Sequence, residues 1–115
     1  MKPMRPTRWH SNKQEKKIAQ AVNGKKVPNS GATLFSKGDV TTNDGWLFEA
    51  KTKMTESKSF SIKREWIEKN KEEAFAMGKN YNALVIDFGD GKQFYLLDEK
   101  TFLRMKNYLE EAENE

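Results

Sequence analysis

The stretch SKGDVTTNDGWLFEAK, residues 36–51, decides the predicted fold, because it has the pattern of two β-strands joined by a tight turn. The turn signal is Asn43-Asp44-Gly45, and a three-residue loop with glycine in the left-handed conformation is a common way to close a hairpin. With this loop Asp39 faces Glu49, and both carboxylates share a side with Lys51, since strand side chains repeat every second residue. The other side then carries apolar side chains, which are Val40, Trp46, Phe48 and Ala50.

The length of the turn decides whether the two acids meet. A two-residue loop, Asp44-Gly45, would pair Asp39 with Ala50 and separate the carboxylates. If they do meet, Asp39, Glu49 and the backbone carbonyl of Ala50 offer the oxygen ligands that a hard cation such as Mg²⁺ prefers. Lys51 lies two strand residues beyond Glu49, roughly 6.5 Å along the chain. The three-residue loop therefore predicts a metal site with a lysine beside it.

The charge of the chain is unevenly distributed. The chain has 115 residues and a net charge of +4, yet residues 1–37 contain nine Lys and Arg against one acid, Glu15. A basic third directly before an acidic hairpin is expected of a protein that holds a cation and binds a polyanion. The alternative is that lysine-rich faces merely keep a small protein in solution.

The rest of the chain alternates helices and strands around the hairpin. Residues 1–10 are predicted to form a flexible basic arm, residues 11–112 a single domain, and residues 113–115 an acidic tail. Ser11 or Asn12 is expected to cap a helix reaching Val22, in which Glu15 lies on the apolar face either as a capping-box acid or as a third carboxylate aimed at the metal. A short or edge strand is expected within residues 25–34, a helix over 62–77 capped by Ser61, strands over 83–88 and 93–97, and a last helix from Asp98 to about Leu109. This order predicts an α/β fold with a mixed central sheet of about five strands flanked by helices.

Composition sets further limits on the protein. The chain has no cysteine, which excludes disulfides and zinc–thiolate sites. No apolar run reaches the roughly 20 residues of a membrane span, and no signal-peptide pattern opens the chain. We therefore expect a cytoplasmic protein without a membrane partner.

The motif Gly38-Asp39, followed ten positions after Asp39 by Glu49-Ala50-Lys51, resembles that of the PD-(D/E)-x-K nuclease superfamily, with Gly38 where proline often stands. More narrowly, the chain resembles the small Holliday junction resolvases of archaea and phages. Besides this motif, the matching pieces are Glu15, residues 27–32 (VPNSGA), residues 37–40 (KGDV), Phe48 to Thr52 (FEAKT), Glu72-Glu73-Ala74 and residues 83–88. The resemblance covers about residues 12–97 and places the protein in a bacterial or archaeal cell, encoded by the cell or by a phage.

The resemblance implies a restriction-endonuclease-like core and a magnesium-dependent homodimeric endonuclease, with Mn²⁺ able to replace Mg²⁺. Asp39 and Glu49 would bind the metal, Lys51 would be the catalytic lysine and Glu15 the acid contributed by a helix. The DNA would be a four-way junction; nicking, repair or restriction-like cleavage of duplex DNA, and non-catalytic DNA binding, are the alternatives. The polar side chains expected to contact DNA are Lys13, Lys25, Lys26, Asn29, Ser30, Lys37, Lys53 and Lys58.

Overall fold

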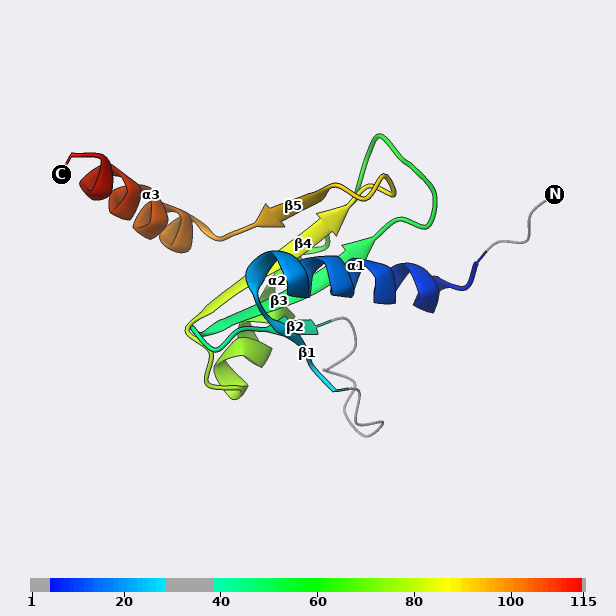
Figure 1. Cartoon of the computed structure of the whole chain (residues 1–115), viewed down its shortest axis with the longest axis horizontal. Coiled ribbons are helices and arrows are strands. Elements are labelled where there is room, and N and C mark those ends of the chain that lie inside the picture. The colour runs from blue at the N-terminus through cyan, green and yellow to red at the C-terminus, as the bar shows by residue number, and fades with distance from the viewer. Residues whose placement is uncertain (1–4, 29–38, 115) are drawn as a thin grey trace.

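The computed structural model describes residues 5–28 and 39–114 and shows an α/β fold (Figure 1). Its elements are α1 (Thr7–Val22), β1 (Lys25–Lys26), β2 (Asp39–Thr41), β3 (Trp46–Thr52), α2 (Arg64–Ala76), β4 (Tyr81–Asp87), β5 (Gln93–Leu96) and α3 (Glu99–Glu113). The strands form one five-stranded sheet in the order β1-β2-β3-β4-β5. Only β3 and β4 run parallel, because α2 connects them, and the other neighbours are antiparallel. The predicted mixed sheet with flanking helices is confirmed.

The β2–β3 hairpin has the predicted register. Asp39 pairs with Glu49, Val40 with Phe48 and Thr41 with Leu47. The amide of Thr42 donates to the carbonyl of Trp46 at 3.1 Å, and Gly45 has a φ of +98°, which glycine tolerates without strain. The three-residue loop Asn43-Asp44-Gly45 is therefore correct, and the two-residue alternative is excluded.

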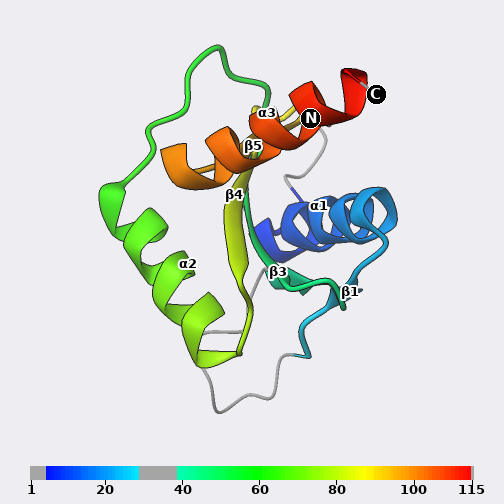
Figure 2. The ribbon, with the colours of Figure 1, turned by 90° about the vertical axis from the view of Figure 1, so that its left-hand side faces the viewer.

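Helices α1 and α2 cover opposite faces of the sheet (Figure 2). On the α1 face, Ile18 packs with Val40, Phe48, Ala83 and Val85 to form the apolar core. On the α2 face, a hydrogen bond of 2.9 Å from the Nδ2 of Asn82 in β4 to the Oδ1 of Asn70 ties helix to strand. Because hairpin residues alternate, Asp39, Glu49 and Lys51 lie on this second face.

Helix α1 begins earlier than the sequence suggests. It starts at Thr7, directly after Pro6, so the flexible arm predicted for residues 1–10 is wrong for residues 7–10. Ser11 and Asn12 lie inside the helix and cap nothing. Instead, the guanidinium of Arg5 lies 4.3 Å and the ammonium of Lys13 5.1 Å from the ring centre of Trp9, and these contacts stabilise the first turns. Because Glu15 is in mid-helix, its interpretation as a capping-box acid is also wrong.

The N-terminal ends of α2 and α3 differ in whether the predicted capping residue forms the cap. The predicted cap of α2, Ser61, lies outside the helix, which begins after Lys63 without a side-chain cap. The ring of Phe60 packs against both Trp66 and Phe88 and so holds the preceding chain to the sheet. Asp98 caps α3 as predicted, because its Oδ1 accepts a 2.8 Å hydrogen bond from the amide of Thr101. That helix continues to Glu113, beyond the predicted end at Leu109.

None of the helices in the described part of the chain combines the length and apolar character needed to cross a bilayer.

Candidate metal-binding and catalytic site

The acidic site is built on the paired strands β2 and β3. Asp39 is 1% exposed and Glu49 is 7% exposed, and they are directly opposite each other in the ladder. Acids are almost never buried to this degree unless they are paired or bind a metal. The sequence therefore placed these two carboxylates correctly, and their burial needs a physical explanation.

A third acid, Glu73 of α2, joins the pair from the helix above this face. Glu73 is 7% exposed and its charge acts on both Asp39 and Glu49. Both oxygens of Asp39, both oxygens of Glu73 and the Oε2 of Glu49 have no donor from the protein. Each buried acceptor left without a donor costs about 1–3 kcal/mol. The negative charge gathered here is therefore poorly compensated by the chain itself.

The pKa values of the two strand acids reflect this environment. Burial, followed by the charges of Glu73 and Glu49, raises the pKa of Asp39 from 3.8 to about 9. Burial also raises the pKa of Glu49, against the lowering effect of Lys51. For both strand acids, burial outweighs any neighbouring positive charge and favours the protonated form.

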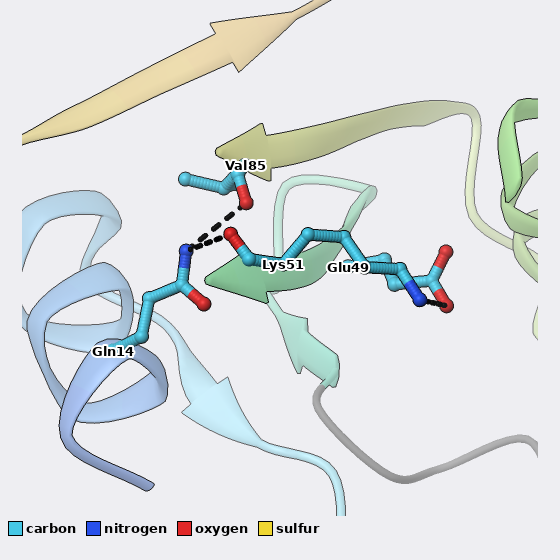
Figure 3. Close-up of polar contacts among 4 residues, drawn as sticks. All are labelled: Gln14, Glu49, Lys51 and Val85. Carbon is cyan, nitrogen blue, oxygen red and sulfur yellow. Dashed lines mark hydrogen bonds and ion pairs between the residues drawn. The ribbon is translucent and has the colours of Figure 1, made fainter. Parts of the chain in front are cut away.

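Lys51 points along β3 toward Glu49 (Figure 3), and its Nζ lies 3.8 Å from the Oε1 of Glu49. The ring of Trp66 from α2 lies beneath the same ammonium, with the Nζ 4.5 Å from the ring centre. A cation over an aromatic face is held with about 0.5–2 kcal/mol. Trp66 is half-buried and restrains the lysine at the edge of the acidic site.

Gln14 of α1 holds the strand that carries Lys51 from the other side of the sheet. Its Nε2 donates to the carbonyl of Lys51 at 3.1 Å, to the carbonyl of Val85 at 3.0 Å and to the Oε1 of Gln93 at 3.0 Å. Figure 3 shows the amide of Gln14 directed at the two carbonyls while the Lys51 side chain runs away from it toward Glu49. A single buried amide thus connects α1 to β3, β4 and β5 where the catalytic lysine was predicted.

Glu15, the third acid predicted for the metal site, lies in α1 and its charge acts on Asp39. It is 7% exposed, and its Oε2 lies 3.7 Å from the Nζ of Lys26 in β1. Its charge contributes to the raised pKa of Asp39, but less than those of Glu73 and Glu49. A role in metal binding remains a prediction for Glu15, and Glu73 is the helix-borne acid that acts more strongly on Asp39.

The predicted DNA-contacting residues divide into three groups. Lys25, Lys26 and Lys58 are exposed, and Lys53 lies 5.2 Å over the ring of Phe60. Lys13 is exposed on α1 against Trp9. Asn29, Ser30 and Lys37 lie outside the described residues. The first two groups place positive charge at the molecular surface.

The site contains residues that sequence reasoning did not assign. Glu73, Gln14 and Trp66 come from helices distant in sequence from the hairpin. One signal was available for Glu73 and Asn70, since a glutamate and an asparagine three residues apart at buried helix positions are unexpected for a purely structural face. Gln14 gave no such signal, because the pattern contains nothing that marks a glutamine as buried.

The donor set suits a small hard cation. No group of three or more His, Asp or Glu side chains within residues 5–28 and 39–114 is arranged to hold a metal ion. Mg²⁺, however, commonly binds through one or two carboxylates and keeps several waters. Asp39 and Glu49, with their buried oxygens lacking donors and with the carbonyl of Ala50 beside them, fit that ion.

Comparison of this chain with protein-family models, with curated proteins and with solved structures gave no match. What can be inferred about function therefore rests on the geometry of this site and on the resemblance of its motif.

Proposed function

We propose that this protein is a divalent-metal-dependent DNA endonuclease and, within that class, a Holliday junction resolvase acting on four-way junctions. The observation that carries the proposal is the buried pair Asp39 and Glu49, matched across β2 and β3, with the ammonium of Lys51 3.8 Å from Glu49. Both oxygens of Asp39 and the Oε2 of Glu49 are buried without a donor, which destabilises a protein, so the pair is more readily explained by function than by folding.

The roles of the residues follow from their chemistry. Asp39 and Glu49, with the carbonyl of Ala50, would bind Mg²⁺, and Mn²⁺ should replace it. The bound ion would supply charge neutralisation at the phosphate and a more acidic water. Lys51 would orient the attacking water or stabilise the charge that develops on the phosphate, and Trp66 and Glu49 hold its ammonium in place.

The surface around the site is suited to a polyanion. Lys25 and Lys26 expose their side chains on β1, beside β2, and Lys13 does so on α1. Lysines that neutralise phosphates provide affinity without sequence preference. Preference for a junction, and the homodimer that paired cuts require, rest on the resemblance to the resolvases.

Cleavage of a labelled four-way junction and of a linear duplex of the same sequence, in Mg²⁺ or in EDTA, tests the proposal. We expect Mg²⁺-dependent cutting of the junction, loss of cutting in Asp39→Asn, and junction binding retained by that variant. Asp44→Asn is the matched control, because Asp44 is an exposed acid in the turn of the same hairpin.

Other outcomes of this assay would indicate a different function or a different role for Asp39. Equal cutting of both substrates would indicate a duplex nuclease, and binding without cutting in Mg²⁺ or Mn²⁺ would indicate a non-catalytic DNA-binding module. If the Asp39→Asn variant still cleaved the junction but bound it less tightly than the wild type, the assigned role of Asp39 would be contradicted.

A further inference from the structure

Helix α3 is the one helix of the described chain that buries none of its residues. It projects from the sheet after β5 (Figure 1), and its large apolar side chains include Phe102 at 54%, Tyr108 at 72% and Leu109 at 59% exposure. A helix of 15 residues is marginal in water, because most helix stability in proteins comes from packing of an apolar face. Apolar surface of this kind commonly marks an interaction site.

The apolar residues of α3 form one stripe. Phe102, Met105 and Leu109 are spaced three and four residues apart, so they lie on the same face of the helix. Grooves flank the stripe on both sides. One, of about 410 Å³, reaches Leu97, and the other, of about 500 Å³, reaches Trp46 and Tyr81 at the end of the sheet. The apolar surface is therefore continuous from the helix to the sheet.

The distribution of charge along α3 favours some binding partners over others. The charged residues of its first half are mostly basic, namely Lys100, Arg104 and Lys106 with Glu99. The charged residues of its last turns are all acidic, namely Glu110, Glu111 and Glu113. Glutamates next to the stripe repel DNA phosphates and anionic lipid surfaces. A helix with the opposite order of charges would be attracted to α3. A second copy of α3 in antiparallel orientation has that order. Antiparallel helix dipoles also attract each other.

We propose that α3 is a self-association surface, which pairs with α3 of a second copy of this chain in antiparallel orientation across a two-fold axis. In that pairing Phe102 packs near Leu109 of the second copy and Met105 lies near the axis. Such an interface is isologous, so each copy contributes the same residues and the assembly closes as a dimer. The surface lies on an element separate from Asp39, Glu49 and Lys51, and the proposal does not depend on nuclease activity.

Sedimentation equilibrium of the full chain, without DNA or metal, tests the association. We expect a dimer for the wild type and for Phe75→Glu, and a dimer weakened at least about tenfold for Leu109→Glu. Phe75 is the matched control, because it is an 87% exposed aromatic residue on α2. A wild type that is monomeric at about 100 μM, above the micromolar range of moderate interfaces, would overturn the proposal. So would a dimer that Leu109→Glu leaves unchanged.

A charge exchange tests the pairing with surface substitutions alone. One variant carries Lys100→Glu, Arg104→Glu and Lys106→Glu, and the other carries Glu110→Lys, Glu111→Lys and Glu113→Lys. Each variant alone should be monomeric, because both halves of its helix then carry the same sign, and an equimolar mixture should form a heterodimer at low salt. Dimerisation of each variant alone, or no association in the mixture, would contradict the proposed contact.

The orientation can be read from disulfide formation, because the chain has no cysteine of its own. Mixed Phe102→Cys and Leu109→Cys variants should form the 102–109 cross-link between copies if the helices are antiparallel. A 102–102 cross-link as the main product would indicate parallel helices and refute the proposed axis.

Discussion

The two faces of the β2–β3 hairpin are equally buried but chemically opposite. Val40 and Phe48 point to α1 and pack among apolar side chains, whereas Asp39 and Glu49, their neighbours in sequence, point to α2 and bury carboxylate oxygens without donors. Burial of Val40 and Phe48 stabilises the fold through the hydrophobic effect, whereas burial of the two carboxylates opposes folding. The comparison indicates that one side of a single hairpin holds the domain together while the other is arranged for chemistry.

Substitution of neighbouring residues on the two faces should give opposite results. Phe48→Ala removes a ring from the apolar core and should lower the free energy of unfolding by about 3–5 kcal/mol. Its melting temperature should fall by more than about 10 °C. Glu49→Gln, one residue further on, should leave the melting temperature unchanged or raise it. Thermal unfolding followed by circular dichroism measures both, and a large loss in Glu49→Gln would mean that the α2 face is also structural.

The α2 face should dominate activity. Lys51→Met removes the ammonium and should slow junction cleavage about 10²–10³-fold, the usual effect of losing one electrostatic stabiliser. Single-turnover rates with saturating enzyme isolate this step from binding. Lys53→Met, two residues along the chain, is the control and should affect mainly affinity, since Lys53 is expected to contact DNA. Equal losses of rate in both variants would indicate that neither lysine is catalytic.

Asp39→Asn should stabilise the protein when metal is absent. The folded pKa of Asp39 lies above its ordinary value of 3.8, so the folded state binds this proton more tightly than the unfolded state does. The stability associated with this group is therefore complete below 3.8 and is lost as the pH rises toward about 9. At neutral pH in EDTA, Asp39→Asn should be more stable by about 1–2 kcal/mol. Urea unfolding across this pH range measures the difference, which should widen with rising pH, and a variant less stable than the wild type would contradict this account.

The smallest expected effect is stabilisation by the ion itself. Mg²⁺ at ten times its dissociation constant should add about 1.4 kcal/mol to the stability of the wild type, because it binds only the folded state. Asp39→Asn should show almost none of this increase, whereas Asp44→Asn should show all of it. Differential scanning fluorimetry in Mg²⁺ and in EDTA makes the measurement. An equal increase in all three proteins would place the ion elsewhere.

Local patterns were enough to predict the hairpin and the order of helices and strands along the chain. The Asn43-Asp44-Gly45 turn and the alternation of apolar and polar residues determine the register by short-range geometry, so Asp39, Glu49 and Lys51 were correctly placed on one face. The cap at Asp98 was predicted for the same reason, because the hydrogen bond that forms it spans three residues.

Only the tertiary structure decided which side chains from the helices contact the hairpin. Glu73 approaches Asp39, Trp66 lies under Lys51 and Gln14 joins three strands because α1 and α2 pack on opposite faces, and these contacts join residues far apart in the chain. The early start of α1 and the late start of α2 follow from aromatic contacts of Trp9 and Phe60 rather than from capping residues. The sequence by itself determined which side chains the hairpin presents to each face, because that depends on turn length and side-chain alternation. The packed helices determined the charge, burial and restraint of those side chains, because these depend on neighbours that only the folded chain brings together.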